Sequence, residues 1–333
     1  MEHQKGTCQR LNSAVSQRML GAPVEEDITV GIRNYNRTDS LITALASVRA
    51  QSDVVKILVV DDGSNPSLGS LYAALASDFD FEVEFHAENL GGAAALNTLV
   101  ACVKTEFLCL LDSDDVLSPT YFRTMLGAMK ANPGYSAAYA PLQPRSEKWL
   151  PSGCSIYGEV LKNGFMAAAG GLLVRVSLLR EFFPIVSRKP GAPFLDLCED
   201  DRVSFEIAKR ACVLSVPRVV YYPGSGSGNV SSDRKLMRTA WVVFYLDYAD
   251  DFIQLGLASA LGWHLGRSLG EGGLTNSEFE KKLIHAFLGS VGLKVQMQVV
   301  SCLAANLLRT LTLRVTQRTA KRFISHLRRI SSH

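Results

Sequence analysis

The feature that most constrains the fold is an alternation of short apolar runs with helical patterns in the first 130 residues. After the first run, Leu41, Leu45 and Val48 recur at helical spacing behind the polar residues Asp39 and Ser40. Four consecutive units of this kind predict an α/β fold with a mostly parallel central sheet covered by helices. The four runs of β type are residues 28–32, 55–60, 81–85 and 107–111.

Polar and glycine residues follow each run, at the carboxyl ends of the expected strands. In parallel sheets the loops at these ends converge on one crevice, which is where ligands bind. Carboxylates, amides and glycines at that position suit a nucleotide and its metal. The residues that we expect to bind such a nucleotide ligand are Asn34, Tyr35, Asn36, Asp61, Asp62, Asn89, Gly91, Gly92, Asn97, Asp112 and Ser113.

The acidic turn after the fourth run predicts a metal site. Carboxylates crowded behind a buried strand repel one another and lose solvation unless a cation lies among them. Mg²⁺ or Mn²⁺ held by Asp112 and Asp114 could bridge a diphosphate, with Asp115 as an alternative ligand to Asp114. The simpler alternative is that Asp114 and Asp115 cap the next helix, whose start we expect at Ser118 and Pro119.

Two other turns point to the nucleotide. Asp61 could accept a hydrogen bond from the imide of a uracil base, although an Asp-Gly turn at Asp62 and Gly63 needs no ligand. The segment NLGGAAALN allows close backbone approach and opens a helix whose N-terminus suits negative charge. Tight helix packing by Gly and Ala would explain the same segment.

Together the segments VGIRNYNR, ILVVDDGS, NLGGAAALN and FLCLLDSDD, in this order, resemble family 2 of the nucleotide-sugar glycosyltransferases, over about residues 27–230. The resemblance implies the GT-A fold and a single in-line displacement at the sugar. It also implies a later acidic pair that supplies the base, which in CEDDRVSFEI matches Asp200 with Glu199 before it. We expect Glu199, Asp200 and Asp201 to raise one another's pKa values; the alternative is an acidic first turn favouring a helix dipole.

Two positions depart from the family pattern. The first loop has Arg33 and Asn34 where a Pro-Thr type of pair is usual, and Arg33 has no explanation in the sequence. Tyr222 stands roughly where many members have a histidine that helps to bind metal or diphosphate. Ser225 and Ser227 could contact phosphate instead, although a Gly-Ser loop is commonly just a linker.

The chain is expected to have three parts: an arm over residues 1–26, the GT-A domain over 27–231, and a helical region with a basic amphipathic tail over 232–333. It has 35 basic and 32 acidic residues, and the last 25 residues hold seven basic and no acidic ones. The body is thus mildly acidic (28 against 32), which argues against a nucleic-acid partner. Seven scattered cysteines and no apolar leader favour reduced thiols in the cytoplasm.

The stretch from Ala286 to Leu308 is long enough to cross a bilayer, but Lys294, Gln296 and Gln298 favour a buried or interface helix. In the tail, apolar residues such as Phe323 line one helical face and arginines line another. Peripheral contact with the inner face of a membrane and a homodimer through the C-terminal helices both fit this pattern.

The function that we expect is an inverting transfer of a sugar from a nucleotide diphosphate, with UDP favoured, to a glycan or lipid-linked acceptor in polysaccharide or glycoconjugate synthesis. A sugar nucleotidylyltransferase is one alternative, but RNYNR lacks the glycine-rich loop that it would need. A member that binds nucleotide or glycan without turnover is another. Sugar, acceptor and linkage are not determined by any motif in the sequence.

Overall fold

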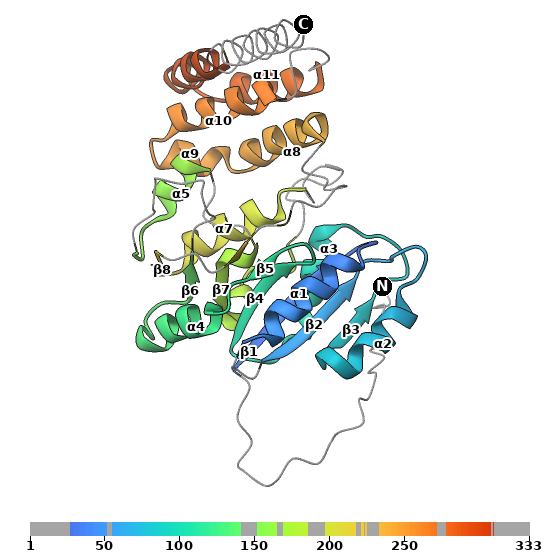
Figure 1. The fold of residues 1–333 in the computed structure, drawn as a ribbon. Coiled ribbons are helices and arrows are strands. Elements are labelled where there is room, and N and C mark those ends of the chain that lie inside the picture. Colours follow the sequence, from blue (N-terminus) through green and yellow to red (C-terminus); the bar gives the residue numbers. More distant parts are fainter. Residues whose placement is uncertain are drawn as a thin grey trace, which may run out of the picture. The chain divides into compact units, whose positions relative to one another are not determined.

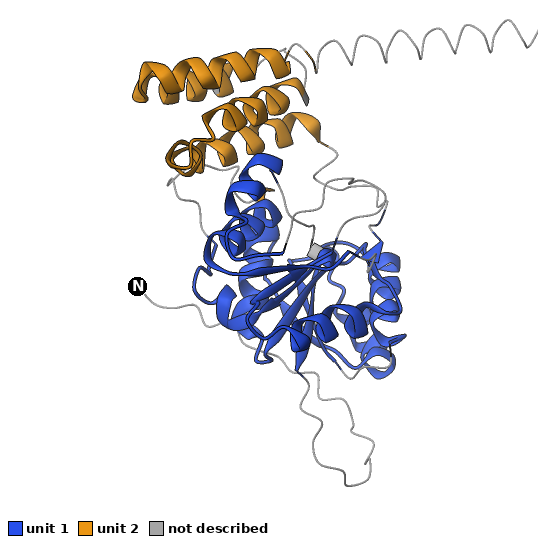
Figure 2. Cartoon of the chain, turned by 90° about the vertical axis from the view of Figure 1, so that its left-hand side faces the viewer, with its two compact units in different colours: residues 1–187, 199–228 blue, residues 188–198, 229–333 orange. Residues whose placement is uncertain are grey.

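The structure is a computed structural model of the 333-residue chain. It describes residues 27–51, 55–140, 152–164, 169–185, 197–217, 221–222, 224, 233–271, 278–307 and 309. Two compact units divide the chain, one formed by residues 1–187 and 199–228 and the other by residues 188–198 and 229–333 (Figure 2).

A seven-stranded sheet forms the centre of the first unit, in the order β3-β2-β1-β4-β7-β6-β8 (Figure 1). The neighbours among β1, β2, β3 and β4 pair in parallel, as the alternating sequence pattern predicts. β7 runs antiparallel to both β4 and β6, and β8 is parallel to β6. The strands are β1 (Ile28–Asn34), β2 (Lys56–Asp61), β3 (Glu82–Phe85), β4 (Phe107–Asp112), β6 (Ala137–Tyr139), β7 (Leu172–Arg175) and β8 (Val213–Ser215), and a separate two-stranded ribbon joins β5 (Val116–Leu117) to β9 (Tyr221–Tyr222).

The central strands are buried on both faces, which explains their unbroken apolar sequences. Val30 and Ile32 of β1 lie in the core on one face, with Leu41 and Leu45 of α1. Gly31 points the other way, and a Cβ there would lie 3.1 Å from side-chain atoms of Leu99 in α3. The helices of this unit are α1 (Asp39–Arg49), α2 (Gly69–Phe79), α3 (Gly92–Cys102), α4 (Tyr121–Ala131), α5 (Tyr157–Asn163), α6 (Val176–Leu179) and α7 (Glu199–Arg210), with a 3₁₀ turn η1 (Ala169–Gly171).

The acidic turn after β4 is longer than the sequence pattern suggests. The helix expected to open at Ser118 and Pro119 begins at Tyr121, because β5 lies in between and pairs with β9. Asp114 and Asp115 therefore precede a strand and do not cap α4. Near this pairing, Gly224 meets the acidic turn, where its backbone N–H donates to Asp115 at 3.0 Å.

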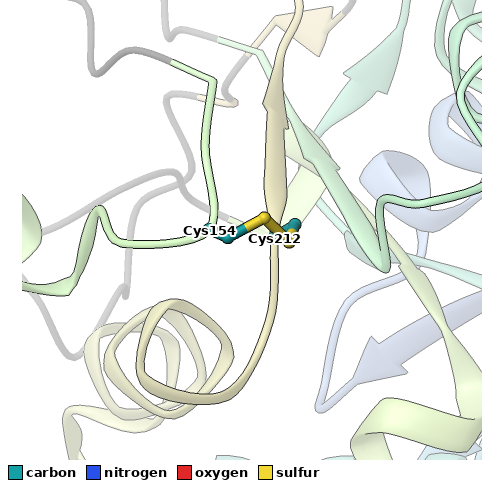
Figure 3. The surroundings of a disulfide bond; sticks show 2 residues. All are labelled: Cys154 and Cys212. Atoms are coloured by element: carbon teal, nitrogen blue, oxygen red, sulfur yellow. A yellow bond between two sulfur atoms is a disulfide. The ribbon is translucent and has the colours of Figure 1, made fainter.

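Cys154 and Cys212 form a disulfide, so the expectation of reduced thiols throughout the chain is wrong for this pair (Figure 3). The sequence hides the pair because its members are 58 residues apart. The fold joins them through an antiparallel bridge in which Gly153 and Val213 exchange backbone hydrogen bonds of 3.0 and 2.9 Å. Among the described residues, Cys109 and Cys302 carry free thiols.

Replacing both Cys154 and Cys212 with serine is expected to lower the free energy of unfolding by about 4 kcal/mol, because the cross-link closes a long loop in the unfolded chain. Guanidinium unfolding of the oxidised wild type and of the double variant measures the difference. Reductant should destabilise the wild type by a similar amount and leave the double variant unchanged. Equal midpoints for oxidised and reduced wild-type protein would contradict the assignment.

The second unit is helical in its described part, as the loss of strand patterns after Ser232 predicts. Asp233 caps the first helix by accepting hydrogen bonds of 3.0 Å from the backbone N–H groups of Lys235 and Leu236. The helices are α8 (Arg234–Asp247), α9 (Ala249–Gln254), α10 (Ala258–Glu271) and α11 (Glu278–Ser290), followed by a helical segment over residues 293–307.

The stretch from Ala286 to Leu308 is interrupted at residues 291–292 and is not one continuous helix. Its second part packs closely on α10, where a Cβ at Gly262 or Gly266 would lie 2.2 and 2.4 Å from the carbonyl oxygens of Val299 and Leu303. No helix within the described part of the chain is long and apolar enough to cross a membrane. The basic tail lies outside the described residues, so membrane contact and a homodimer stay predictions.

A buried ion pair joins α8 to α11 in this unit. Arg238 Nε lies 3.1 Å from Glu280 Oε1, and the two side chains are 1% and 3% exposed. The hydroxyl of Thr239 also donates to Glu280 Oε1 at 2.6 Å. Because water barely reaches these side chains, loss of one member of the pair costs more than loss of an exposed ion pair.

Candidate active site

Parallel register brings the first and fourth polar turns together at the carboxyl edge of the sheet. Arg33 at the end of β1 lies opposite Asp112 at the end of β4. On the other side of β1, Asn34 lies opposite Asp61 at the end of β2. The side chains that the sequence places after separate strands are thus neighbours in space.

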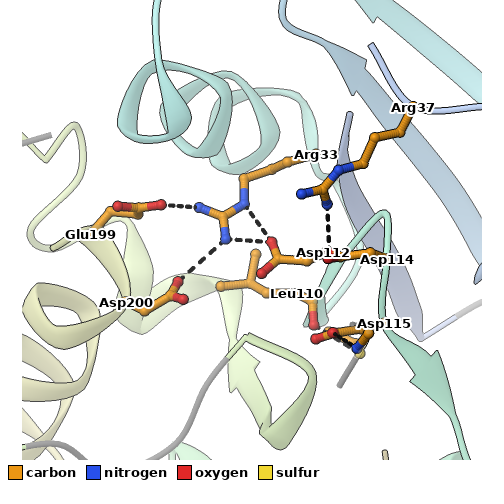
Figure 4. A network of polar contacts seen from close by, with 10 residues as sticks. Arg33, Arg37, Leu110, Asp112, Asp114, Asp115, Glu199 and Asp200 are labelled. Atoms are coloured by element: carbon orange, nitrogen blue, oxygen red, sulfur yellow. Dashed lines mark hydrogen bonds and ion pairs between the residues drawn. The ribbon is translucent and has the colours of Figure 1, made fainter. Parts of the chain in front are cut away.

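The guanidinium of Arg33 joins three carboxylates from two distant parts of the chain (Figure 4). Its Nε and one terminal nitrogen donate to Asp112 Oδ1 at 3.1 and 2.5 Å. The other terminal nitrogen donates to Glu199 Oε1 at 2.8 Å, and Asp200 Oδ1 lies 3.4 Å from the nitrogen that binds Asp112. We call Arg33, Asp112, Glu199 and Asp200 the Arg33 cluster.

Burial and mutual charge perturb the ionisation of this cluster. Burial raises the pKa of Asp200 well above its usual range, and the neighbouring charges of Asp112, Glu199 and Asp201 raise it further, while Arg33 opposes them. Burial alone would lower the pKa of Arg33, but the three acids raise it well above its ordinary value. The guanidinium therefore stays charged, and Asp200 is a carboxyl group that holds a proton unusually well.

Asp114 and Asp115 have different surroundings within the same turn. Asp114 pairs with Arg37 at 2.5 Å (Figure 4), whereas Asp115 accepts a hydrogen bond of 3.0 Å from the backbone N–H of Gly224. Burial, followed by the charge of Asp112, raises the pKa of Asp115 to about 7. A Cβ at Gly224 would lie 1.9 Å from the carbonyl oxygen of Asp114, so this approach requires glycine.

Asp61 is the centre of a buried hydrogen-bond network. Its two carboxylate oxygens accept from the backbone N–H and the hydroxyl of Ser64, each at 2.8 Å, and from the hydroxyl of Tyr72 at 2.5 Å. Asn34 donates to the same Tyr72 hydroxyl at 2.9 Å, and Asn34 Oδ1 is buried with no hydrogen-bond partner among the described residues. Asp61 shapes the loop, and the oxygen of Asn34 is a polar atom that the protein leaves unsatisfied.

Asp62 organises the third turn. It accepts from the backbone N–H groups of Leu90 and Gly91, both at 2.9 Å, and lies 2.7 Å from Nδ1 of His86. The N–H of Gly91, which the sequence suggests for binding the negative charge of a ligand, is therefore engaged by the protein itself. Gly63 has a φ of 70° and packs so closely on Glu88 that a Cβ would lie 2.2 Å from its carbonyl carbon.

The other expected donor-binding residues differ in their surroundings. Tyr35 is exposed, and Asn36 and Asn89 accept hydrogen bonds from the backbone of Asn65 and Gly91. Gly92 lies against the cluster, since a Cβ there would lie 2.7 Å from Glu199 Oε1. By contrast, Ser113 is buried, and Asn97 bonds at both ends of its amide to the backbone of Ile185.

The acids do not present a ready metal shell. No group of three or more His, Cys, Asp or Glu side chains within the described ranges converges as metal ligands. Asp112 and Asp114, the two predicted ligands, each pair with an arginine: Arg33 at the end of β1 and Arg37 just after it. As arranged here, these residues do not fit a divalent cation at Oδ1 of Asp112 or at Oδ1 of Asp114, because each of these oxygens faces a guanidinium group.

Sequence reasoning missed several residues of this edge: Arg37, Tyr72, His86 and Gly224, and the role of Arg33. Arg37 ends the RNYNR segment, and its closeness to Arg33 in the sequence could have suggested a second positively charged side chain at the same turn. Tyr72 and His86 carry no motif, because their contacts with Asp61 and Asp62 depend on tertiary packing.

Comparison with known proteins defines the class. Residues 29–168 match the sequence model of glycosyl transferase family 2. One curated relative, the succinoglycan biosynthesis protein ExoO of Rhizobium meliloti, is 33% identical over 103 residues, which are 30% of this chain and 29% of ExoO. The chain thus matches less than a third of the length of that relative.

Solved structures extend the likeness in fold to most of the chain. TarS of S. aureus in complex with UDP-GlcNAc superposes with a TM-score of 0.62 at 13% identity, over 88% of this chain and 92% of that chain. The mannosyltransferase PcManGT from Pyrobaculum calidifontis, in complex with GDP-Man and Mn²⁺, gives a TM-score of 0.52 at 17% identity, over 84% and 87%. At this identity the likeness shows the fold, which is of the GT-A type predicted above.

Proposed function

We propose that the chain is an inverting glycosyltransferase that moves a sugar from a nucleoside diphosphate, with UDP favoured, to an acceptor hydroxyl of a glycan or glycoconjugate. One observation carries the proposal. The fold brings Asp200, 88 residues beyond Asp112 in the sequence, to the carboxyl edge of the sheet, where both contact the same guanidinium. Asp112 at the end of β4 suits the diphosphate side of an in-line displacement, and Asp200 opposite it suits the acceptor side.

The proposed chemistry needs one base and one leaving group. The carboxylate of Asp200 takes the proton of the acceptor hydroxyl, whose oxygen forms a bond to the anomeric carbon while the bond from that carbon to the diphosphate oxygen breaks. The raised pKa of Asp200 makes its ionised carboxylate a stronger proton acceptor than an ordinary aspartate. Arg33 holds Asp200 in place and adds positive charge next to the departing diphosphate.

The neighbouring network at β1 and β2 suits the nucleotide. Asn34 offers an unsatisfied buried oxygen, and the exposed ring of Tyr35 offers a face for a base. The favoured donor class is consistent with the UDP-GlcNAc named for TarS, although PcManGT is named with GDP-Man. A protein that binds nucleotide without turnover is the second candidate, and it is favoured by the arginine partners of Asp112 and Asp114.

Thermal-shift measurements with UDP-, GDP- and dTDP-sugars test the donor class. A ligand at about a hundred times its Kd stabilises the folded state by about 2.7 kcal/mol, which is a rise of roughly 5 °C or more in Tm for a domain of this size. We expect the UDP-sugars to give this rise and Asn34→Ala to reduce it. Absence of any shift with all three classes would overturn the proposed function, and binding without hydrolysis of the donor would favour the second candidate.

A further inference from the structure

Arg33 is placed where it neutralises acids from both sides of the site. It is 12% exposed, and its three partners Asp112, Glu199 and Asp200 are between 17% and 33% exposed. One positive charge thus faces three carboxylates in a partly desolvated position, where such interactions are stronger than in water. The cluster keeps a negative excess that still attracts cations.

The backbone fixes this arrangement. Arg33 and Asp112 are register partners on adjacent parallel strands, so the guanidinium cannot move far from the carboxylate without a change of rotamer. Both nitrogens that face Asp112 donate to the same oxygen, Oδ1, which is one of the atoms that a metal would need. Arg37 holds Asp114 in a comparable way.

We propose that Arg33 is a positioning residue that takes the place of a metal ion in the donor-free site and competes with divalent cations for Asp112. The inference concerns the site of the proposed function and rests on that proposal for its meaning in catalysis. A divalent cation binds Asp112 only when the guanidinium moves away, or at the cost of repulsion by the nearby positive charge. Removal of the guanidinium should therefore strengthen metal binding, which is the opposite of what loss of a merely structural residue would do.

Mn²⁺ titration of the full chain without nucleotide, followed by electron paramagnetic resonance of the free ion, measures the competition. We expect Arg33→Met to bind Mn²⁺ at least about tenfold more tightly than the wild type, because a repulsive charge within a few ångströms is removed. Arg33→Lys should fall between the two, since a lysine keeps the charge but cannot reach three carboxylates at once. Equal affinity of wild type and Arg33→Met would overturn the proposal.

Two further variants identify the carboxylate and control for the loss of an arginine. In an Asp112→Asn background the gain from Arg33→Met should disappear, and persistence of the full gain would overturn the assignment to Asp112. Arg175→Met removes an arginine that pairs with Glu106 away from the cluster, and it should leave Mn²⁺ affinity unchanged. If Arg33→Met does not fold, the double variant Arg33→Met with Glu199→Gln is measured instead, because it removes one acid together with the arginine. Its affinity for Mn²⁺ should exceed that of the single variant Glu199→Gln by the same factor.

These titrations contain no nucleotide, so they separate the two proposals. If the chain binds no sugar nucleotide but Arg33→Met gains Mn²⁺ affinity, the proposed competition is supported and the proposed function is overturned. If the chain binds a UDP-sugar but Arg33→Met shows no gain in Mn²⁺ affinity, the proposed function is supported and the proposed competition is overturned.

Discussion

Replacement of Asp200 with asparagine is expected to lower the rate of sugar transfer about a thousandfold while donor binding stays intact. A general base contributes typically a hundredfold to ten-thousandfold, and an amide cannot accept the acceptor's proton. The shape of the side chain is retained, so Arg33 keeps a neighbour that accepts a hydrogen bond. Release of nucleoside diphosphate from the donor identified by thermal shift, with water or an added glycan as acceptor, measures the rate.

Asp201→Asn is the matched control, because it removes one charge from the same first turn of α7. It should change the rate only a few-fold, through the pKa of Asp200 that Asp201 helps to raise. Wild-type turnover by Asp200→Asn, with the thermal shift of the donor unchanged, would exclude Asp200 as the base. Loss of the thermal shift in Asp200→Asn would instead assign this residue to donor binding.

A large effect on stability is expected from Glu280→Gln in the second unit. The substitution removes the carboxylate that faces the buried guanidinium of Arg238, and breaking a buried pair in this way costs about 3–5 kcal/mol. Denaturant unfolding monitored by far-UV circular dichroism measures the loss, which should appear as a lower midpoint for the helical unit. The apolar double variant Arg238→Met with Glu280→Leu should recover much of it, because both charges of the buried pair are removed together.

Glu278→Gln on the same helix is the control for this experiment. Glu278 is 77% exposed and lies 3.3 Å from Lys281, so its loss should cost less than about 1 kcal/mol. Equal effects of Glu278→Gln and Glu280→Gln would contradict a special role for the buried pair.

The same pair predicts the direction of a pH effect. Burial alone would raise the pKa of Glu280, but the Thr239 hydroxyl and Arg238 together hold it below its ordinary value. A depressed carboxyl pKa contributes stability that is present above the unfolded value of about 4.3 and is lost as the pH falls through the folded value. The difference in stability between wild type and Glu280→Gln should therefore shrink in acid.

The sequence by itself determined the parallel half of the sheet. Burial on both faces requires β1, β2 and β4 to be continuous apolar runs, and such runs can be recognised in a short stretch of sequence. It also placed Asp61 and Asp112 at the carboxyl edge, since each directly follows its run. The helical nature of the second unit was equally legible from periodicity.

Only the tertiary structure decided which of these residues meet. Register set Arg33 against Asp112, and the fold brought Glu199 to the same guanidinium across 166 positions of sequence. The disulfide between Cys154 and Cys212 and the ion pair between Arg238 and Glu280 have the same origin. Local patterns record which face of an element is buried, whereas the partner of a buried charge or thiol depends on how distant elements pack.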